Sequence, residues 1–221
     1  MMICGKWYDL IMASMRAVLL AAGVVLFALG APCAYGQTTP TDPERVAQLA
    51  EDLHAAERAH LWRVALWGSA SLAGGLAAWS LASRNEHPAW WSFGGMTAGW
   101  GAVNVGIAAV GGLALDPPAT TLGGALSAER TYHDILLLNL GLNVAYVGVG
   151  GTLLAAGARG VASAPEWRGA GTALIVQGAG LLVLDGIAFV ASRARLGELL
   201  GATGHMSMRA VPPGLSLTVL F

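Results

Sequence analysis

The sequence predicts an all-α integral membrane protein: a four-helix bundle with an N-terminal amphipathic helix and a short C-terminal β-like tail. Of its 221 residues, 55% are hydrophobic and only 11% are charged, whereas soluble domains carry about a quarter charged residues. The apolar residues gather in four stretches long enough to cross a bilayer core. Tryptophans flank these stretches, as expected at membrane interfaces.

Residues 15–36 have the pattern of an export signal. Arg16 supplies the positive flank, and 17–29 is an apolar run of signal-peptide length. Small residues at the −3 and −1 positions predict cleavage before Gln37. We therefore expect residues 1–36 to be a signal peptide, the N-terminus to be exported, and the protein to reside in a bacterial membrane, most simply the inner one. Uncleaved, the same run would be a further membrane anchor.

Residues 37–60 are predicted to form a polar linker and an amphipathic helix. Thr41 and Glu44 have the spacing of a capping box at the start of that helix. One apolar face follows at three- and four-residue steps, formed by Val46, Leu49, Leu53, Ala56 and His60. The helix should run directly into the first span. Its apolar face would lie on the membrane surface, pack on a partner protein, or remain part of a solvated extension.

Four apolar segments are predicted to span the membrane, within a domain covering residues 61–192. The spans are 62–81, 91–115, 135–156 and 172–190, separated by polar breaks at 83–88, 116–134 and 157–171. Small residues four positions apart are predicted at the contacts between helices. These pairs are Gly95 and Gly99, Ala102 and Gly106, Gly141 and Ala145, and Gly148 and Thr152. A compact bundle or a homo-oligomer would use them.

Two signals bear on the orientation of the spans, and they disagree. The tryptophans are consistent with one parsing, because Trp79, Trp90, Trp91 and Trp167 fall at one interface and Trp62 at the other. An exported N-terminus would place both termini outside. The distribution of arginines mildly favours the reverse by the positive-inside rule. We give the export signal more weight, and the sequence leaves the orientation open.

Residues 193–221 are predicted to form a tail of a different kind. Two short segments that favour strands surround the turn at 212–214, and apolar residues alternate along 215–221. A small hairpin, or an extended tail that seeks a partner, fits this pattern.

Polar residues inside the predicted spans form a candidate site. The cluster comprises Asp185, Asn143, Asn104, Asn139, Gln177 and Tyr146. Counted from the end that their spans share, the depths of Asn104, Asn143 and Asp185 agree within about 5 Å at a rise of 1.5 Å per residue. We expect these three side chains to meet in the bundle. A carboxylate inside a membrane indicates either a proton- or cation-responsive site or a hydrogen bond that fixes helix register.

Several functions are disfavoured by composition. A net charge of −1 gives no field for nucleic acid. Both cysteines fall within the predicted signal, and the histidines lack metal-ligand spacing, so we expect no metal and no cofactor. No nucleophile–base pair is apparent, so we expect no enzyme.

The sequence therefore predicts a non-enzymatic accessory or structural membrane protein. Its partners would be the lipid bilayer and either another protein or a second copy of itself. The alternative is a small ion- or proton-coupled transporter centred on Asp185.

Two motifs carry a resemblance to a known group of proteins. Residues 139–146, and residues 177–181 continuing to Asp185, resemble an uncharacterised family of small bacterial membrane proteins that contain a domain of unknown function. The resemblance covers about residues 61–221, including a tail that closes on Phe221. It implies a signal peptide and four spans, and no activity. This chain departs from the family pattern at Asn143, where an acidic residue is expected, so the resemblance does not support a paired-carboxylate site.

Overall fold

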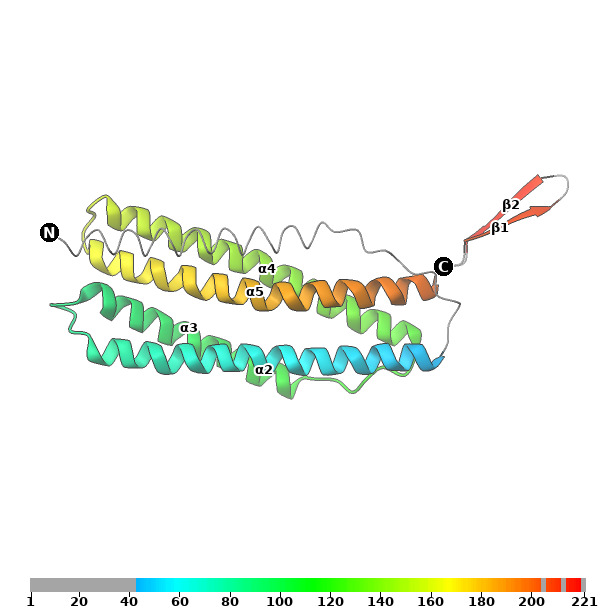
Figure 1. Ribbon diagram of the computed structural model, residues 1–221, viewed down its shortest axis with the longest axis horizontal. Helices are drawn as coiled ribbons and strands as arrows, with labels where there is room; N and C mark the ends of the chain where they lie inside the picture. Colours follow the sequence, from blue (N-terminus) through cyan, green and yellow to red (C-terminus); the bar gives the residue numbers. More distant parts are fainter. Residues whose placement is uncertain (1–42, 204–205, 212–213, 220–221) are drawn as a thin grey trace.

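The computed structural model describes residues 43–203, 206–211 and 214–219. Four helices form its body: α2 (Pro43–Leu81), α3 (Pro88–Leu113), α4 (Leu122–Ala158) and α5 (Ala164–Thr203) (Figure 1). Strands β1 (Met206–Val211) and β2 (Gly214–Val219) pair antiparallel, with Met206 opposite Val219. The predicted signal peptide and Thr41 lie outside the described residues.

The helices are longer than the predicted spans. The amphipathic segment and the first span form one helix of 39 residues, which confirms that they are continuous. The predicted breaks at 116–134 and 157–171 are wrong in extent, because α4 already begins at Leu122 and α5 at Ala164. Thr121 caps α4, its Oγ1 accepting a hydrogen bond from the Gly124 amide at 3.2 Å. The polar residues beyond that cap belong to a helix and not to a loop.

The bundle consists of two helical hairpins. Helix α2 packs along α3, and α4 along α5. The hairpins join mainly through α3 and α5, while the backbones of α3 and α4 stay apart and these two helices meet through the side chains of Trp100 and Tyr146. This leaves α3 and α4 as neighbours across a gap that backbone contacts do not close.

Close helix approach depends on glycines that the sequence analysis did not single out. A Cβ on Gly75 of α2 would lie 2.3 Å from the Ala98 nitrogen of α3, and one on Gly150 of α4 would lie 2.7 Å from the Gly171 oxygen of α5. The predicted pairs do not form the close contacts within the bundle: Gly99, Gly106, Gly141 and Gly148 have open space at the Cβ position, and a Cβ on Gly95 would lie at an ordinary 3.6 Å from Trp79. Their use in a homo-oligomer stays a prediction. Both sets have helical spacing, but the predicted set, apart from Gly95, lies on the outer faces.

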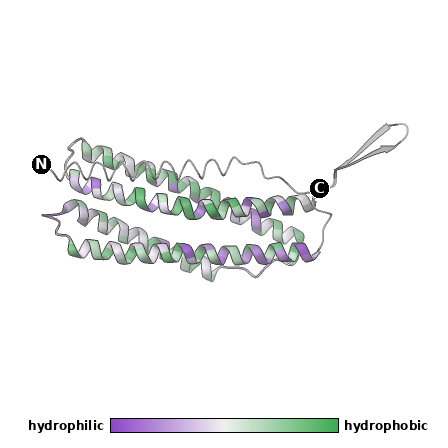
Figure 2. Cartoon of the chain, in the orientation of Figure 1, coloured by the Kyte–Doolittle hydropathy of each residue, from purple (hydrophilic) through white to green (hydrophobic). Residues whose placement is uncertain are grey.

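The helices divide along their length into two parts. All four are long and apolar enough to cross a membrane. We call residues 61–115 and 135–190 the apolar segment. At its far end the rings of Trp79 and Trp91 lie 6.1 Å apart. We call residues 43–60, 122–134 and 191–203 the polar segment. Figure 2 shows hydrophilic residues gathered in the corresponding half of α2.

The polar segment has a hydrophobic core of its own. Val46, Leu49 and Ala50 of α2 are buried against Ala125 of α4 and Leu199 of α5. The chain itself therefore covers the apolar face of residues 43–60, which corrects the expectation that this face lies on a membrane surface or on a partner. An exposed ion pair between Arg45 and Glu198 also links α2 to α5.

Candidate functional site

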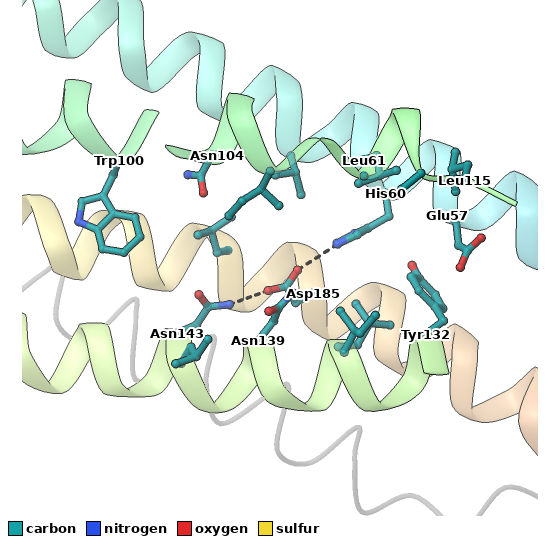
Figure 3. Close-up of a pocket in the computed structure, with 18 of the residues that line it drawn as sticks. Glu57, His60, Leu61, Trp100, Asn104, Leu115, Tyr132, Asn139, Asn143 and Asp185 are labelled. Carbon is teal, nitrogen blue, oxygen red and sulfur yellow. Dashed lines mark hydrogen bonds and ion pairs between the residues drawn. The ribbon is translucent and has the colours of Figure 1, made fainter. Parts of the chain in front are cut away.

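Asp185 of α5 is the centre of a buried polar group drawn from three helices. One carboxylate oxygen, Oδ1, lies 3.1 Å from Nε2 of His60 on α2. The other, Oδ2, accepts a hydrogen bond from Nδ2 of Asn143 on α4 at 2.6 Å (Figure 3). All three residues are more than nine-tenths buried. Both carboxylate oxygens are thus engaged, which offsets the cost of burying the group.

No role in the site is predicted for His60 from the sequence. Its helical position continues the apolar series of residues 46–56, so it faces the bundle, and a polar side chain on such a face needs a partner. This position was the feature of the sequence that could have pointed to His60. Nε2 faces Asp185, while the other ring nitrogen, Nδ1, is buried without a hydrogen-bond partner among the described residues. The ring also meets Tyr132 edge-on, with centroids 6.4 Å apart.

A cavity of about 360 Å³ lies beside this group. All four helices contribute to its largely apolar wall. Figure 3 shows Asn104 of α3 on the side of the cavity opposite Asn143. Nδ2 of Asn104 and the hydroxyl of Tyr132 are buried and have no hydrogen-bond partner within the described chain. Three buried polar groups at the cavity, counting Nδ1 of His60, thus retain unused hydrogen-bonding capacity.

The structure brings together most of the residues predicted to form the cluster. Asp185, Asn143, Asn104, Asn139 and Tyr146 all line the same cavity.

Gln177 lies apart from the cavity. Its Oε1 accepts a hydrogen bond from Nε1 of Trp67 at 3.0 Å, and its Nε2 donates to Oγ of Ser71, also at 3.0 Å. This residue joins α5 to α2, and its amide has the partners that Asn104 Nδ2 lacks.

A second buried network lies in the polar segment, where the sequence analysis expected a loop and a tail. Glu129 of α4 is fully buried. Its carboxylate accepts hydrogen bonds from Nε of Arg195 at 2.8 Å, Nη2 of Arg195 at 3.2 Å and Oγ of Ser192 at 2.6 Å. Nδ1 of His133 lies 3.3 Å from the same Oγ. The Ser192 hydroxyl donates to the carboxylate and is fully buried, so it is not placed as a nucleophile.

Two titratable groups of the cavity wall lie near enough to this network to be affected by its charges. Burial raises the pKa of Glu57 above its ordinary value, and the negative charge of Glu129 raises it further. Burial likewise raises the pKa of Tyr132. Both residues line the cavity. Their neutral forms are therefore favoured at its polar end.

The arrangement suits proton exchange and hydrogen bonding more than covalent chemistry. A histidine in contact with a carboxylate can gain or lose a proton while its partner compensates the charge. Within the described ranges, no group of three or more histidine, cysteine, aspartate or glutamate side chains is placed to hold a metal ion.

The family assignment rests on more than half of the chain. Residues 63–186 match the profile of DUF6992, a family of unknown function. The chain belongs to this family. The DUF6992 match includes both motifs that carried the resemblance, but it stops one residue after Asp185 and leaves out the tail. His60 and Glu57 precede the matched DUF6992 region. No curated protein and no solved structure matches the chain.

Proposed function

We propose that this protein is a non-enzymatic membrane protein that binds a small molecule in the cavity beside Asp185, and that the contact between His60 and Asp185 makes binding depend on protonation. One observation carries the proposal. Three buried polar groups that have no hydrogen-bond partner among the described residues line a cavity that adjoins a buried acid–base pair. Buried polar groups normally have hydrogen-bond partners, and a bound molecule would supply them.

The membrane position is part of the same proposal. The apolar segment would cross the bilayer, with Trp79 and Trp91 at one interface. The polar segment would project on the other side. With the predicted export signal, that side is the exterior of a bacterial inner membrane. The cavity would then lie where the two segments meet.

The dependence on protonation follows from the two nitrogens of one ring. In a neutral imidazole whose Nε2 donates to Asp185, Nδ1 is an acceptor, and in the charged form it becomes a donor. Other titratable groups also line the cavity. Glu57 lies on α2, the helix of His60, and Tyr132 and Tyr146 lie on α4. Glu57 and Tyr132 have raised pKa values. A proton gained on Nδ1 of His60 would thus change which hydrogen-bonding groups the cavity accepts.

A transport role for the same site remains the alternative, since a proton-dependent cavity is also what a small coupled transporter needs. The role of a partner-binding accessory protein stays a prediction of the sequence. One reason for that prediction no longer holds, because residues of α4 and α5 cover the apolar face of residues 43–60.

Native mass spectrometry of the full chain, extracted gently from its membrane, tests the proposal. We expect a small-molecule adduct whose occupancy changes with pH in the wild type and not in Asp185→Asn. Val64→Phe places a ring in the cavity and should remove the adduct. Val103→Phe is the matched control, because Val103 does not line the cavity and is 48% exposed. A stoichiometric second protein with no adduct would contradict the proposal and favour the accessory role.

A further inference from the structure

We infer that the bound molecule is a lipid-soluble compound with an uncharged, carbonyl-bearing headgroup, and that it reaches the cavity sideways from the bilayer between α3 and α4. This inference rests on the proposed function and names the class of molecule that the cavity takes.

The route follows from the exposed residues of the cavity wall. The polar centre of the wall is buried, but Ile107 of α3 and Ile135 and Leu142 of α4 are 56%, 51% and 42% exposed at the bundle surface. The backbones of these two helices do not approach closely, although the rings of Trp100 and Tyr146 connect them at one level. The mouth of the cavity therefore lies between them, within the apolar segment, and its rim is apolar. A molecule already dissolved in the bilayer would meet this opening without crossing water.

The two acidic residues of the cavity wall, Asp185 and Glu57, offer no free charge to a ligand, which favours an uncharged headgroup. Asp185 is already in contact with His60 and Asn143, and the raised pKa of Glu57 favours its neutral form. A charged molecule would give up its hydration in a largely apolar cavity and find no opposite charge to offset that cost.

Two of the three unused polar groups favour a hydrogen-bond acceptor, and Nδ1 of His60 joins them when the ring is protonated. Nδ2 of Asn104 can only donate a hydrogen bond, and the Tyr132 hydroxyl can donate one. A carbonyl oxygen accepts from such donors. A cavity of about 360 Å³ falls at the lower end of the range for small-molecule sites, roughly 300–1,000 Å³. A ring-sized headgroup would fill it, and an apolar tail would leave through the mouth.

Two aromatic rings in the wall, tilted by 55° to each other, suit a headgroup with a planar ring. The rings of Trp100 and Tyr146 lie 4.5 Å apart, one from α3 and one from α4, and both line the cavity. A quinone ring carries two carbonyl oxygens, no charge and a flat face that can stack on such rings. Quinones therefore provide a suitable probe, and a diacylglycerol tests the same carbonyl chemistry from a glyceride source.

Binding of ubiquinone-1 to the full chain in phosphatidylcholine nanodiscs, followed by quenching of tryptophan fluorescence, tests the inference. We expect saturable binding that weakens at least tenfold in Asn104→Leu. Thr97→Val is the matched control, because Thr97 is also buried on α3 with an unpartnered hydroxyl but does not line the cavity. It should bind within twofold of the wild type. Oleate, which carries a charge, should not compete.

A second pair of variants tests the route without disturbing the core. Ile107→Trp narrows the mouth and should weaken or slow binding of ubiquinone-1. Val110→Trp, at a residue of α3 that is 67% exposed and outside the cavity wall, should not.

The outcomes separate this inference from the proposed function. Displacement of a fluorescent lipid by diacylglycerol, dependent on Asn104, would support the class with a glyceride as its source. Equal binding of ubiquinone-1 and diacylglycerol to wild type and Asn104→Leu, or stronger binding of oleate, would overturn the inference. The adduct seen by mass spectrometry would still stand in that case, because its detection assumes no class of molecule.

Discussion

Removal of the Glu129 carboxylate should destabilise the polar segment more than any loss of a surface charge. Glu129→Leu leaves the guanidinium of Arg195, whose side chain is only 12% exposed, without the carboxylate that now accepts two of its hydrogen bonds. It also takes the acceptor away from the buried Ser192 hydroxyl. Breaking a buried ion pair by removing one partner costs about 3–5 kcal/mol.

The matched control is an exposed ion pair in the same polar segment, which joins α2 to α5. Glu198 is paired with Arg45, with side chains 41% and 44% exposed, and surface pairs contribute about 0–1 kcal/mol. For a chain of this size, about 1 kcal/mol corresponds to about 2–4 °C in melting temperature. We therefore expect Glu129→Leu to lower the melting temperature by about 6–20 °C and Glu198→Leu by at most about 4 °C.

Thermal unfolding in a mild detergent, followed by tryptophan fluorescence at one fixed scan rate, measures the difference. A double variant, Glu129→Leu with Arg195→Met, should recover most of the loss, because no buried charge is then left without a partner. The reasoning is refuted if Glu129→Leu costs no more than Glu198→Leu. It is also refuted if the double variant is less stable than Glu129→Leu alone.

Three further predictions concern the rest of the bundle. Asp185→Leu should lower the melting temperature in detergent, because it leaves two buried donors without an acceptor at about 1–3 kcal/mol each; an unchanged value would exclude a structural role for the carboxylate. Gly101→Ala should disrupt the α2–α3 hairpin, since its Cβ would lie 2.3 Å from the Leu72 nitrogen, whereas Gly99→Ala, with open space, should be neutral when both are compared by circular dichroism melting. For Glu57, the folded state has the higher pKa and holds its proton to higher pH, so stability falls as pH rises above its ordinary value of 4.5. Glu57→Gln should thus raise the melting temperature at pH 7 by an amount that shrinks toward pH 4, and a difference that grows at low pH would contradict this sign.

The sequence predicted part of the site because helices convert sequence position into depth. Asn143 and Asp185 were expected at one level by counting residues along antiparallel spans, and the structure joins them by a hydrogen bond. Counting residues along the spans could not include His60, because the predicted first span begins only at residue 62. Its contact with Asp185 exists because α2 is continuous and α5 runs beside it.

The network around Glu129 was beyond the reach of that argument. Glu129 and Arg195 are 66 residues apart and lie in segments whose polarity resembles that of loops and tails. A charged residue at a helical position indicates a solvated face unless the packing of a distant helix buries it. Only the tertiary structure shows that α4 and α5 extend past the apolar segment and pack there.

The sequence by itself determined the fold class and the level of the polar residues along the bundle. Apolar length and helical rise are properties of each segment alone, and they need no information about neighbours. The tertiary structure decided which face of each helix points inward. Small residues recur with helical spacing on more than one face of α3 and α4, and only steric fit between backbones distinguishes Gly101 and Gly150 at the contacts from Gly99 and Gly148 outside them. The same choice of faces sets Asn104 opposite Asn143 across a cavity and leaves the amide nitrogen of Asn104 without a partner in the described part of the chain.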